Sequence, residues 1–447
     1  MSNLRVTLSK NALFYYYIVV MALLKIPPFY YYPISNRLFS SHTLVKELLI
    51  ILLLLTLLTK HKLISFVLNK KKLVLIILLF FFFTQSISII NAKDLVLFGQ
   101  YYHNLILFIV VFFLSLIHFS EKQNKRLSII INLILILGVV LILGELLIFY
   151  SFNYLEPLIK SIFQNEYLDA LLVNIARGRN TLISNNELFI PFFLSCWLLN
   201  QRSIFRLRTT KLLCQFFTLI LFFQSFFSSN RTRFVVALFI MIAYSTIIKY
   251  WRRTKKNYKK FKPGYYLIII FLVFVAANST RYIFNTVNIV ERVSLSLNKD
   301  SSDFQSSTYR IEAVDNSISV LKSSPVIGVG LGNYVFYSNS KTDLYGSSLI
   351  ATPSQKNFMN KIKYSPHNIF SQTIAETGII GLLGFSLLIA YFLIGDINLI
   401  KNRRINLLAF IISSWVVFIP FLFNPHHTLF VSGWFWFFRG IIEAVKN

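Results

Sequence analysis

Arginine and histidine side chains at the edges of apolar segments are the residues of this 447-residue chain best suited to chemistry. Arg231 and Arg233 lie in the stretch Ser-Ser-Asn-Arg-Thr-Arg-Phe, between two apolar runs. Arg310 precedes an amphipathic stretch, and His367 comes directly before a long apolar segment. A guanidinium stays charged and can hold a phosphate through two parallel hydrogen bonds. A neutral imidazole can accept a proton from a hydroxyl near pH 7. The pattern predicts an anion clamp combined with a general base.

Each of these residues also has a simpler reading. An arginine at a helix mouth can extend toward lipid phosphate, and a histidine before a helix can cap it or contact interfacial water. Arg310 has acidic neighbours that could pair with it. Arg177 and Arg179 are further cations ahead of an apolar segment, where Asn186 and Glu187 could simply cap a helix.

Two other patterns suggest chemistry that the sequence does not support. His103 and the pair His426 and His427 are rival histidines, but no acid or cysteine cluster accompanies them, so we expect no metal. The Gly-Val-Gly-Leu-Gly stretch at 328–332 lacks the full spacing of a nucleotide loop, and no βαβ pattern surrounds it. We interpret it as a turn that lets backbones approach closely, and we expect no cofactor.

The composition predicts an all-α polytopic membrane protein. Hydrophobic residues make up 55% of the chain and charged residues only 14%, against roughly 25% charged in soluble proteins. The apolar runs are solid, whereas a β-barrel would need alternating segments of about ten residues. The net charge of +28 lies mostly in short loops between these runs, which is typical of cytoplasmic loops and not of nucleic-acid binding.

Hydropathy and loop charge together predict about twelve transmembrane helices with both termini cytoplasmic. The basic connections that we assign to the cytoplasm are 60–72, 120–126, 201–211, 250–263 and 396–404. The predicted spans are 11–24, 43–59, 73–91, 97–119, 127–150, 186–200, 212–228, 233–249, 264–280, 369–395, 405–422 and 428–444. The first is interpreted as a retained helix because no small-residue cleavage site follows it.

The chain therefore reads as a single integral membrane domain, 1–447, with two long extracytoplasmic loops at 151–185 and 281–368. Each loop contains an apolar stripe at helical spacing, which favours a short helix lying in the membrane interface. In the second loop the stripe is predicted to start near Ser306 or Ser307 and to end before Pro325. Glycines at 378, 381 and 384 favour close helix packing within the span that follows.

An ordered set of motifs resembles the O-antigen ligase superfamily. The set comprises an arginine at an outer helix mouth, then Arg310, then Ser-Pro-Val-Ile-Gly-Val-Gly-Leu-Gly-Asn-Tyr, then His-Asn followed by Ala-Glu-Thr-Gly. Asn230–Arg231 is similar to the Ser-Arg of the family, with Asn where Ser is usual, and Asn186–Glu187 is similar to its Asn-Glu. The likeness covers roughly the second half of the chain, 186–444, whereas the first five spans match only in hydrophobicity.

The resemblance implies a metal-independent, C-type glycosyltransferase whose site faces the periplasm or exterior of a bacterial inner (cytoplasmic) membrane. The implied donor is a glycan on undecaprenyl diphosphate. Arg231 and Arg310 would hold the diphosphate, and His367 would assist deprotonation of the acceptor hydroxyl. We add Arg233, Arg177, Arg179 and Asn368 as expected contacts to the diphosphate or glycan.

Several functions remain open at this point. The same chemistry could ligate O-antigen to lipid A core in lipopolysaccharide synthesis, polymerise O-antigen or exopolysaccharide repeats, or glycosylate a protein hydroxyl. A more distant possibility is a flippase for lipid-linked glycans. We consider this flippase less suitable because transporters usually carry charged or broken helices at the membrane midplane. The predicted spans are nearly free of charge, with Glu145 as the main exception.

Overall fold

The computed structural model describes residues 15, 18, 33–34, 39–40, 51, 55, 69–120, 123–162, 186–199, 208–227, 231–253, 263–283, 294–295, 297–298, 302–337, 368–422 and 429–446. Their regular secondary structure is helical apart from a short antiparallel pair, β1 (Pro33–Ile34) and β2 (Phe39–Ser40), in which Pro33 faces Ser40. The α-helices are α5 (Lys72–Ser86), α6 (Leu95–Ser120), α7 (Gln123–Ile162), α9 (Ile190–Leu199), α10 (Arg208–Phe227), α11 (Arg231–Arg253), α12 (Pro263–Ile283), α14 (Ser302–Ser323), α16 (Ile369–Lys401), α17 (Ile405–Phe418) and α18 (Leu429–Val445). The 3₁₀ helices are η1 (Ile87–Asn91), η2 (Asn186–Phe189), η3 (Asn333–Phe336) and η4 (Ile419–Leu422).

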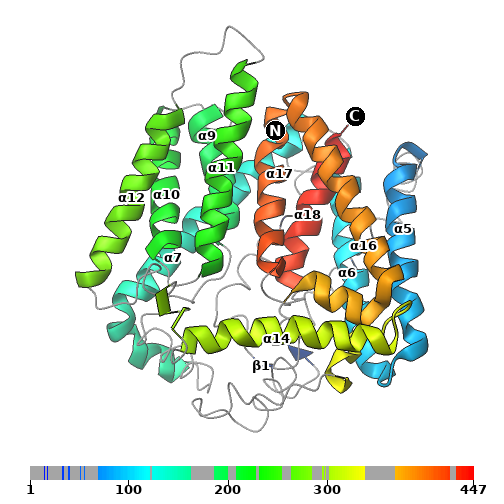
Figure 1. The fold of residues 1–447 in the computed structure, drawn as a ribbon. Coiled ribbons are helices and arrows are strands. Elements are labelled where there is room, and N and C mark those ends of the chain that lie inside the picture. Colours follow the sequence, from blue (N-terminus) through cyan, green and yellow to red (C-terminus); the bar gives the residue numbers. More distant parts are fainter. Residues whose placement is uncertain are drawn as a thin grey trace.

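Most of the long helices stand side by side as a bundle, and α14 lies crosswise over one end of it (Figure 1). Within the part of the chain that the structure describes, six helices are long and apolar enough to cross a membrane. These segments are 72–91, 95–120, 125–144, 231–251, 369–401 and 405–422. Shorter apolar helices occupy 186–199, 211–227 and 268–279. The prediction of a polytopic helical protein is confirmed at this level.

Every predicted span from 73–91 onward coincides with a helix, whereas the spans at 11–24 and 43–59 fall almost wholly outside the described residues. Two boundaries differ from the prediction. Helix α7 continues to Ile162, beyond the expected end at 150, and α16 continues to Lys401, into the expected loop 396–404. Both extensions add polar residues to an apolar helix, which hydropathy alone treats as loop.

Charged side chains are buried between the helices, which corrects the expectation of nearly charge-free spans. Arg439 of α18 pairs with Asp396 of α16, with Nη1 2.6 Å from Oδ2, and both side chains are almost fully buried. The indole of Trp415 donates to the same carboxylate oxygen at 2.7 Å. The guanidinium also lies over the rings of Trp415 and Phe435. A buried charge is tolerable only when it is paired in this way.

Helix α14 begins at Ser302, four residues before the earliest predicted start, and ends at Ser323 as expected from Pro325. Its predicted apolar stripe lies on the exposed side of the helix, and its placement in the membrane interface stays a prediction. Ile311 is 65% exposed and Ile318 is 47% exposed, whereas Ala313, Ser317 and Val320 are buried. The buried face is lined by small residues because the helix lies close against the bundle, and Tyr334 Oη reaches the carbonyl of Ala313 at 3.3 Å.

Candidate active site

The glycine-rich turn after α14 docks onto a break in α16. Gly378 has φ 65° and ψ −167° inside α16, so the helical hydrogen bonds are interrupted there. The turn replaces them, because the N–H groups of Val329 and Gly330 donate to the carbonyls of Ala375 and Glu376 at 3.2 and 2.8 Å. In return, the N–H groups of Ile379 and Ile380 donate to the carbonyls of Pro325 and Val326 at 3.0 and 3.1 Å. A break among buried residues requires such compensation, because buried N–H and C=O groups need hydrogen-bond partners.

Three glycines of the turn adopt positive φ, and each touches a different neighbour. A Cβ atom on Gly328 would lie 2.4 Å from the backbone of Glu376, and one on Gly330 would lie 2.7 Å from Cβ of Ala92. Gly332 faces the ring of Tyr101, 2.5 Å from such an atom. The prediction of a close-packing turn is therefore confirmed. Among the glycines of α16, Gly384 packs against Thr84 of α5, but Gly378 marks the break.

Asparagine side chains fasten the same turn to the connection between α5 and α6. Asn333, fully buried, accepts from the N–H of Asp94 at 2.7 Å and donates to its carbonyl at 3.2 Å. Asn91 donates to Oγ of Ser324 at 2.6 Å and to the carbonyl of Gly328 at 2.9 Å. The connection between α5 and α6, in the first half of the chain, thus holds the glycine turn of the second half in place.

Asn368 caps the first turn of α16. Its Oδ1 accepts from the N–H groups of Phe370 and Ser371 at 2.8 and 3.1 Å, and its Nδ2 donates to the carbonyl of Leu422 at 3.0 Å. A cap of this kind is worth about 1 kcal/mol to a helix. We expected Asn368 to contact the diphosphate or glycan. The structure engages its side-chain nitrogen and oxygen in holding α16 against η4, immediately after His367.

The two arginines at the start of α11 have different surroundings. Arg231, the first residue of α11, is half-buried. Arg233 is buried, and its Nε lies 3.2 Å from Oε1 of Glu187, the second residue of η2. Ser225 also reaches that oxygen at 3.5 Å. Arg233 thereby fastens the first turn of α11 to the start of α9, and Glu187 does more than cap a helix.

The remaining predicted site residues are only partly within the described chain. Arg310 is half-buried on α14, which crosses the end of the bundle where α11 and α16 begin (Figure 1). The structure thus brings the elements that carry Arg231, Arg310 and Asn368 to one end. His367, Arg177 and Arg179 lie outside the described residues, as do His426 and His427. His103 is described and is exposed on α6. Among the described residues, no cluster of histidine, cysteine or acidic side chains could hold a metal ion.

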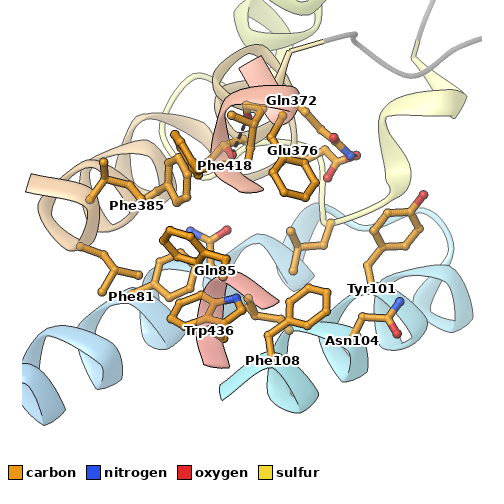
Figure 2. A pocket seen from close by; sticks show the side chains of 18 residues that line it. Phe81, Gln85, Tyr101, Asn104, Phe108, Gln372, Glu376, Phe385, Phe418 and Trp436 are labelled. Carbon is orange, nitrogen blue, oxygen red and sulfur yellow. Dashed lines mark hydrogen bonds between the residues drawn. The ribbon is translucent and has the colours of Figure 1, made fainter. Parts of the chain in front are cut away.

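A pocket of about 100 Å³ opens between α5, α6, the first half of α16 and α18, next to the turn that Asn368 caps. Its wall is largely aromatic and includes Phe81, Phe108, Phe385 and Trp436 (Figure 2). Aliphatic side chains also line the pocket, and its polar lining residues are Gln85, Tyr101, Asn104, Gln372, Thr373 and Glu376. Gln372 donates to Oε1 of Glu376 at 3.2 Å, drawn as a dashed line in Figure 2.

Sequence reasoning missed most of these pocket residues. Gln85, Tyr101 and Asn104 belong to apolar spans that carry no motif, and a polar residue within such a span was the one available signal. Glu376 stood inside the quoted Ala-Glu-Thr-Gly motif, but its contact with the glycine turn is a tertiary feature. The backbone N–H of Gly332 donates to its carboxylate, across the turn described above.

Residues 216–386 match the family model described as O-antigen ligase. The predicted resemblance to the O-antigen ligase superfamily is confirmed. The match includes α11, α14, the glycine turn and the start of α16, which are the elements that meet at one end of the bundle. No curated protein matches the chain. Together with its apolar helices, the match indicates a multi-pass membrane protein with a region similar to O-antigen ligases.

Proposed function

We propose that the protein transfers a glycan from an undecaprenyl-diphosphate donor to a hydroxyl acceptor on the outer face of a bacterial inner membrane. The O-antigen ligase match carries this proposal, because its span of 216–386 contains Arg231, Arg310 and His367. The convergence of α11, α14 and the start of α16 at one end of the bundle supports it (Figure 1). Both termini would then face the cytoplasm, as the basic connections in the sequence predict.

The proposed reaction is a displacement at the anomeric carbon. The acceptor oxygen forms a bond to that carbon, the bond from the carbon to the diphosphate oxygen breaks, and His367 receives the hydroxyl proton. Negative charge grows on the departing diphosphate. Arg231 and Arg310 would stabilise that charge, because preorganised cations act strongly in a site that excludes much of the water. This proposed route requires no metal ion.

The contacts of Arg233 and Asn368 suggest supporting roles for both residues within this proposal. Arg233 pairs with Glu187, and Asn368 caps α16. Each would therefore orient a neighbour: Arg233 the first turn of α11 with Arg231, and Asn368 the backbone next to His367. Arg177 and Arg179 stay predicted contacts to the donor.

The acceptor distinguishes the candidate activities. Ligation to lipid A core, polymerisation of repeat units and glycosylation of a protein hydroxyl share the chemistry above. A flippase would move the donor without breaking a bond. The buried charges at Asp396 and Arg439 remove part of the argument against transport, but they pair with each other and the guanidinium lies over aromatic rings, which favours an enzyme.

The experiment that tests this proposal is reconstitution of the full chain in liposomes with undecaprenyl-diphosphate glycan and separate acceptors. A ladder of longer lipid-linked glycans would identify a polymerase, and a single addition to lipid A core or to a protein would identify a ligase or a protein glycosyltransferase. Movement of intact donor between leaflets, with no product on any hydroxyl acceptor, would contradict the proposal.

A further inference from the structure

The pocket between α5, α6, α16 and α18 has a charge character opposite to that expected of a diphosphate site. Among the described residues that line it, none is lysine, arginine or histidine, and Glu376 contributes a carboxyl group. The arginines predicted to hold the donor, Arg231 and Arg310, are not in its lining. An anionic ligand would lose its hydration there without a compensating cation, and it would meet like charge whenever Glu376 is ionised, so the pocket suits an uncharged group.

Polar side chains converge on this pocket from three elements. Gln85 comes from α5, Tyr101 and Asn104 from α6, and Gln372 and Glu376 from α16. In Figure 2, Tyr101, Asn104, Gln372 and Glu376 stand on one side of the pocket, across from Phe81 and Phe385. A pure hydrocarbon ligand would leave this polar side facing an apolar surface, which costs free energy. The combination favours a ligand with one apolar face and several hydroxyls.

The carboxyl of Glu376 has capacity for such a ligand. It already accepts from Gln372 and from the backbone N–H of Gly332. A carboxylate offers about four lone-pair positions, so it can accept from ligand hydroxyls as well. Pockets of this kind orient a ligand through a few placed polar groups within a largely aromatic wall.

The pocket also adjoins the start of the helix that follows the predicted base. Ile369, Gln372 and Thr373, all in its lining, belong to the first turns of α16, which begins directly after His367 and Asn368. We propose, building on the transfer activity above, that this pocket receives an uncharged, hydroxyl-bearing ring of the acceptor. Glu376 accepts hydrogen bonds from that ring and excludes rings that carry a carboxylate or phosphate.

Binding without donor tests this directly. The full chain in nanodiscs is dialysed against radiolabelled butyl glucoside, butyl glucuronide or butanol, which share one apolar chain and differ in the ring and its charge. Like-charge contacts at a binding site cost several kcal/mol, so we expect the glucoside to bind about 100-fold more tightly than the glucuronide. Butanol should bind more weakly than the glucoside.

Variants assign the selectivity to the pocket. Glu376→Gln keeps size and an acceptor oxygen, so it should retain glucoside binding and reduce the preference over glucuronide to below about tenfold. Leu388→Trp fills the pocket and should abolish glucoside binding. Leu387→Trp is the matched control, because Leu387 is 53% exposed whereas Leu388 is 1% exposed and lines the pocket. If Leu388→Trp does not fold, the preference of Glu376→Gln for glucoside over glucuronide alone tests the pocket assignment.

Any of three results would overturn the assignment. The unmodified chain could bind glucoside and glucuronide equally, or Glu376→Gln could leave the preference for glucoside unchanged. Butanol could also bind as tightly as the glucoside, which would indicate a hydrocarbon site. Transfer plays no part in this measurement. If the chain binds the glucoside selectively but transfers no glycan, the pocket assignment stands and the proposed function is rejected. If the chain transfers glycan but does not bind the glucoside selectively, the proposed function stands and the pocket assignment is rejected.

Discussion

The backbones of Gly328 and Gly378 are in direct contact. A Cβ atom built on Gly378 would lie 2.6 Å from the amide nitrogen of Gly328, and both residues have positive φ. The contact joins a turn that follows α14 to a break inside α16, so the positive φ of each glycine serves the same contact. Through this joint the crosswise helix α14, which carries Arg310, is fixed to the helix that begins after His367.

Alanine at Gly378 should therefore disrupt the joint. At φ 65° and ψ −167°, a conformation essentially restricted to glycine, a residue with a Cβ costs roughly 1–3 kcal/mol from backbone strain alone. Here the new atom also overlaps the carbonyl of Val326 at 2.4 Å. We expect a clearly lower midpoint of thermal unfolding in detergent. Gly99→Ala is the control, since a Cβ atom there meets nothing within 4 Å. Equal midpoints for the two variants would show that the joint does not stabilise the fold.

Alanine replacements of the two arginines of α11 should differ in their effects on stability and on glycan transfer. Arg233→Ala leaves the buried carboxylate of Glu187 without its ion-pair partner, a change that typically costs ~3–5 kcal/mol, so stability and transfer should fall together. Arg231→Ala should keep the unfolding midpoint and lose transfer. Paired measurement of unfolding and product formation distinguishes them. A stable, inactive Arg233→Ala would instead make Arg233 a direct ligand of the donor.

Replacement of Asn333 tests the hydrogen bonds that hold the glycine turn to the connection between α5 and α6. In Asn333→Asp the carboxylate can still accept from the N–H of Asp94, but it places negative charge against the carbonyls of Asp94 and Leu331, to which Asn333 now donates. Loss of buried hydrogen bonds of this type costs ~1–3 kcal/mol. Urea or thermal unfolding should show the loss, while Asn316→Asp on half-buried α14 surface should show little. Comparable stability of the two variants would show that the hydrogen bonds of Asn333 do not stabilise the fold.

Local sequence patterns predicted much of the helical layout. Solid apolar runs located the long apolar helices from α5 to α18, and an amphipathic stripe and Pro325 predicted α14 and its end, because these features depend on neighbours in the chain. The break at Gly378 was missed, since hydropathy sees an unbroken apolar segment. Its partner Gly328 is fifty residues away in sequence, and only tertiary structure brings the two together.

Side-chain roles were predicted less well for the same reason. Arg233 and Arg231 look alike in Asn-Arg-Thr-Arg, yet only the fold brings Glu187 to Arg233. The apolar stripe of Ile311 and Ile318 lies on the exposed side of α14, as in an interfacial helix, but the pattern did not show that Ala313 and Ser317 form the buried side. The pocket draws Gln85 and Asn104 from spans without any motif, so no spacing rule could have selected them.

The most direct test of the central claim is glycan transfer by the reconstituted chain after single replacement of Arg231, Arg310 or His367 by alanine. Each variant should remain folded in the membrane and bring transfer from an undecaprenyl-diphosphate donor to background, because each removes a donor-binding cation or the base. Transfer at the unmodified rate by all three folded variants would contradict the account.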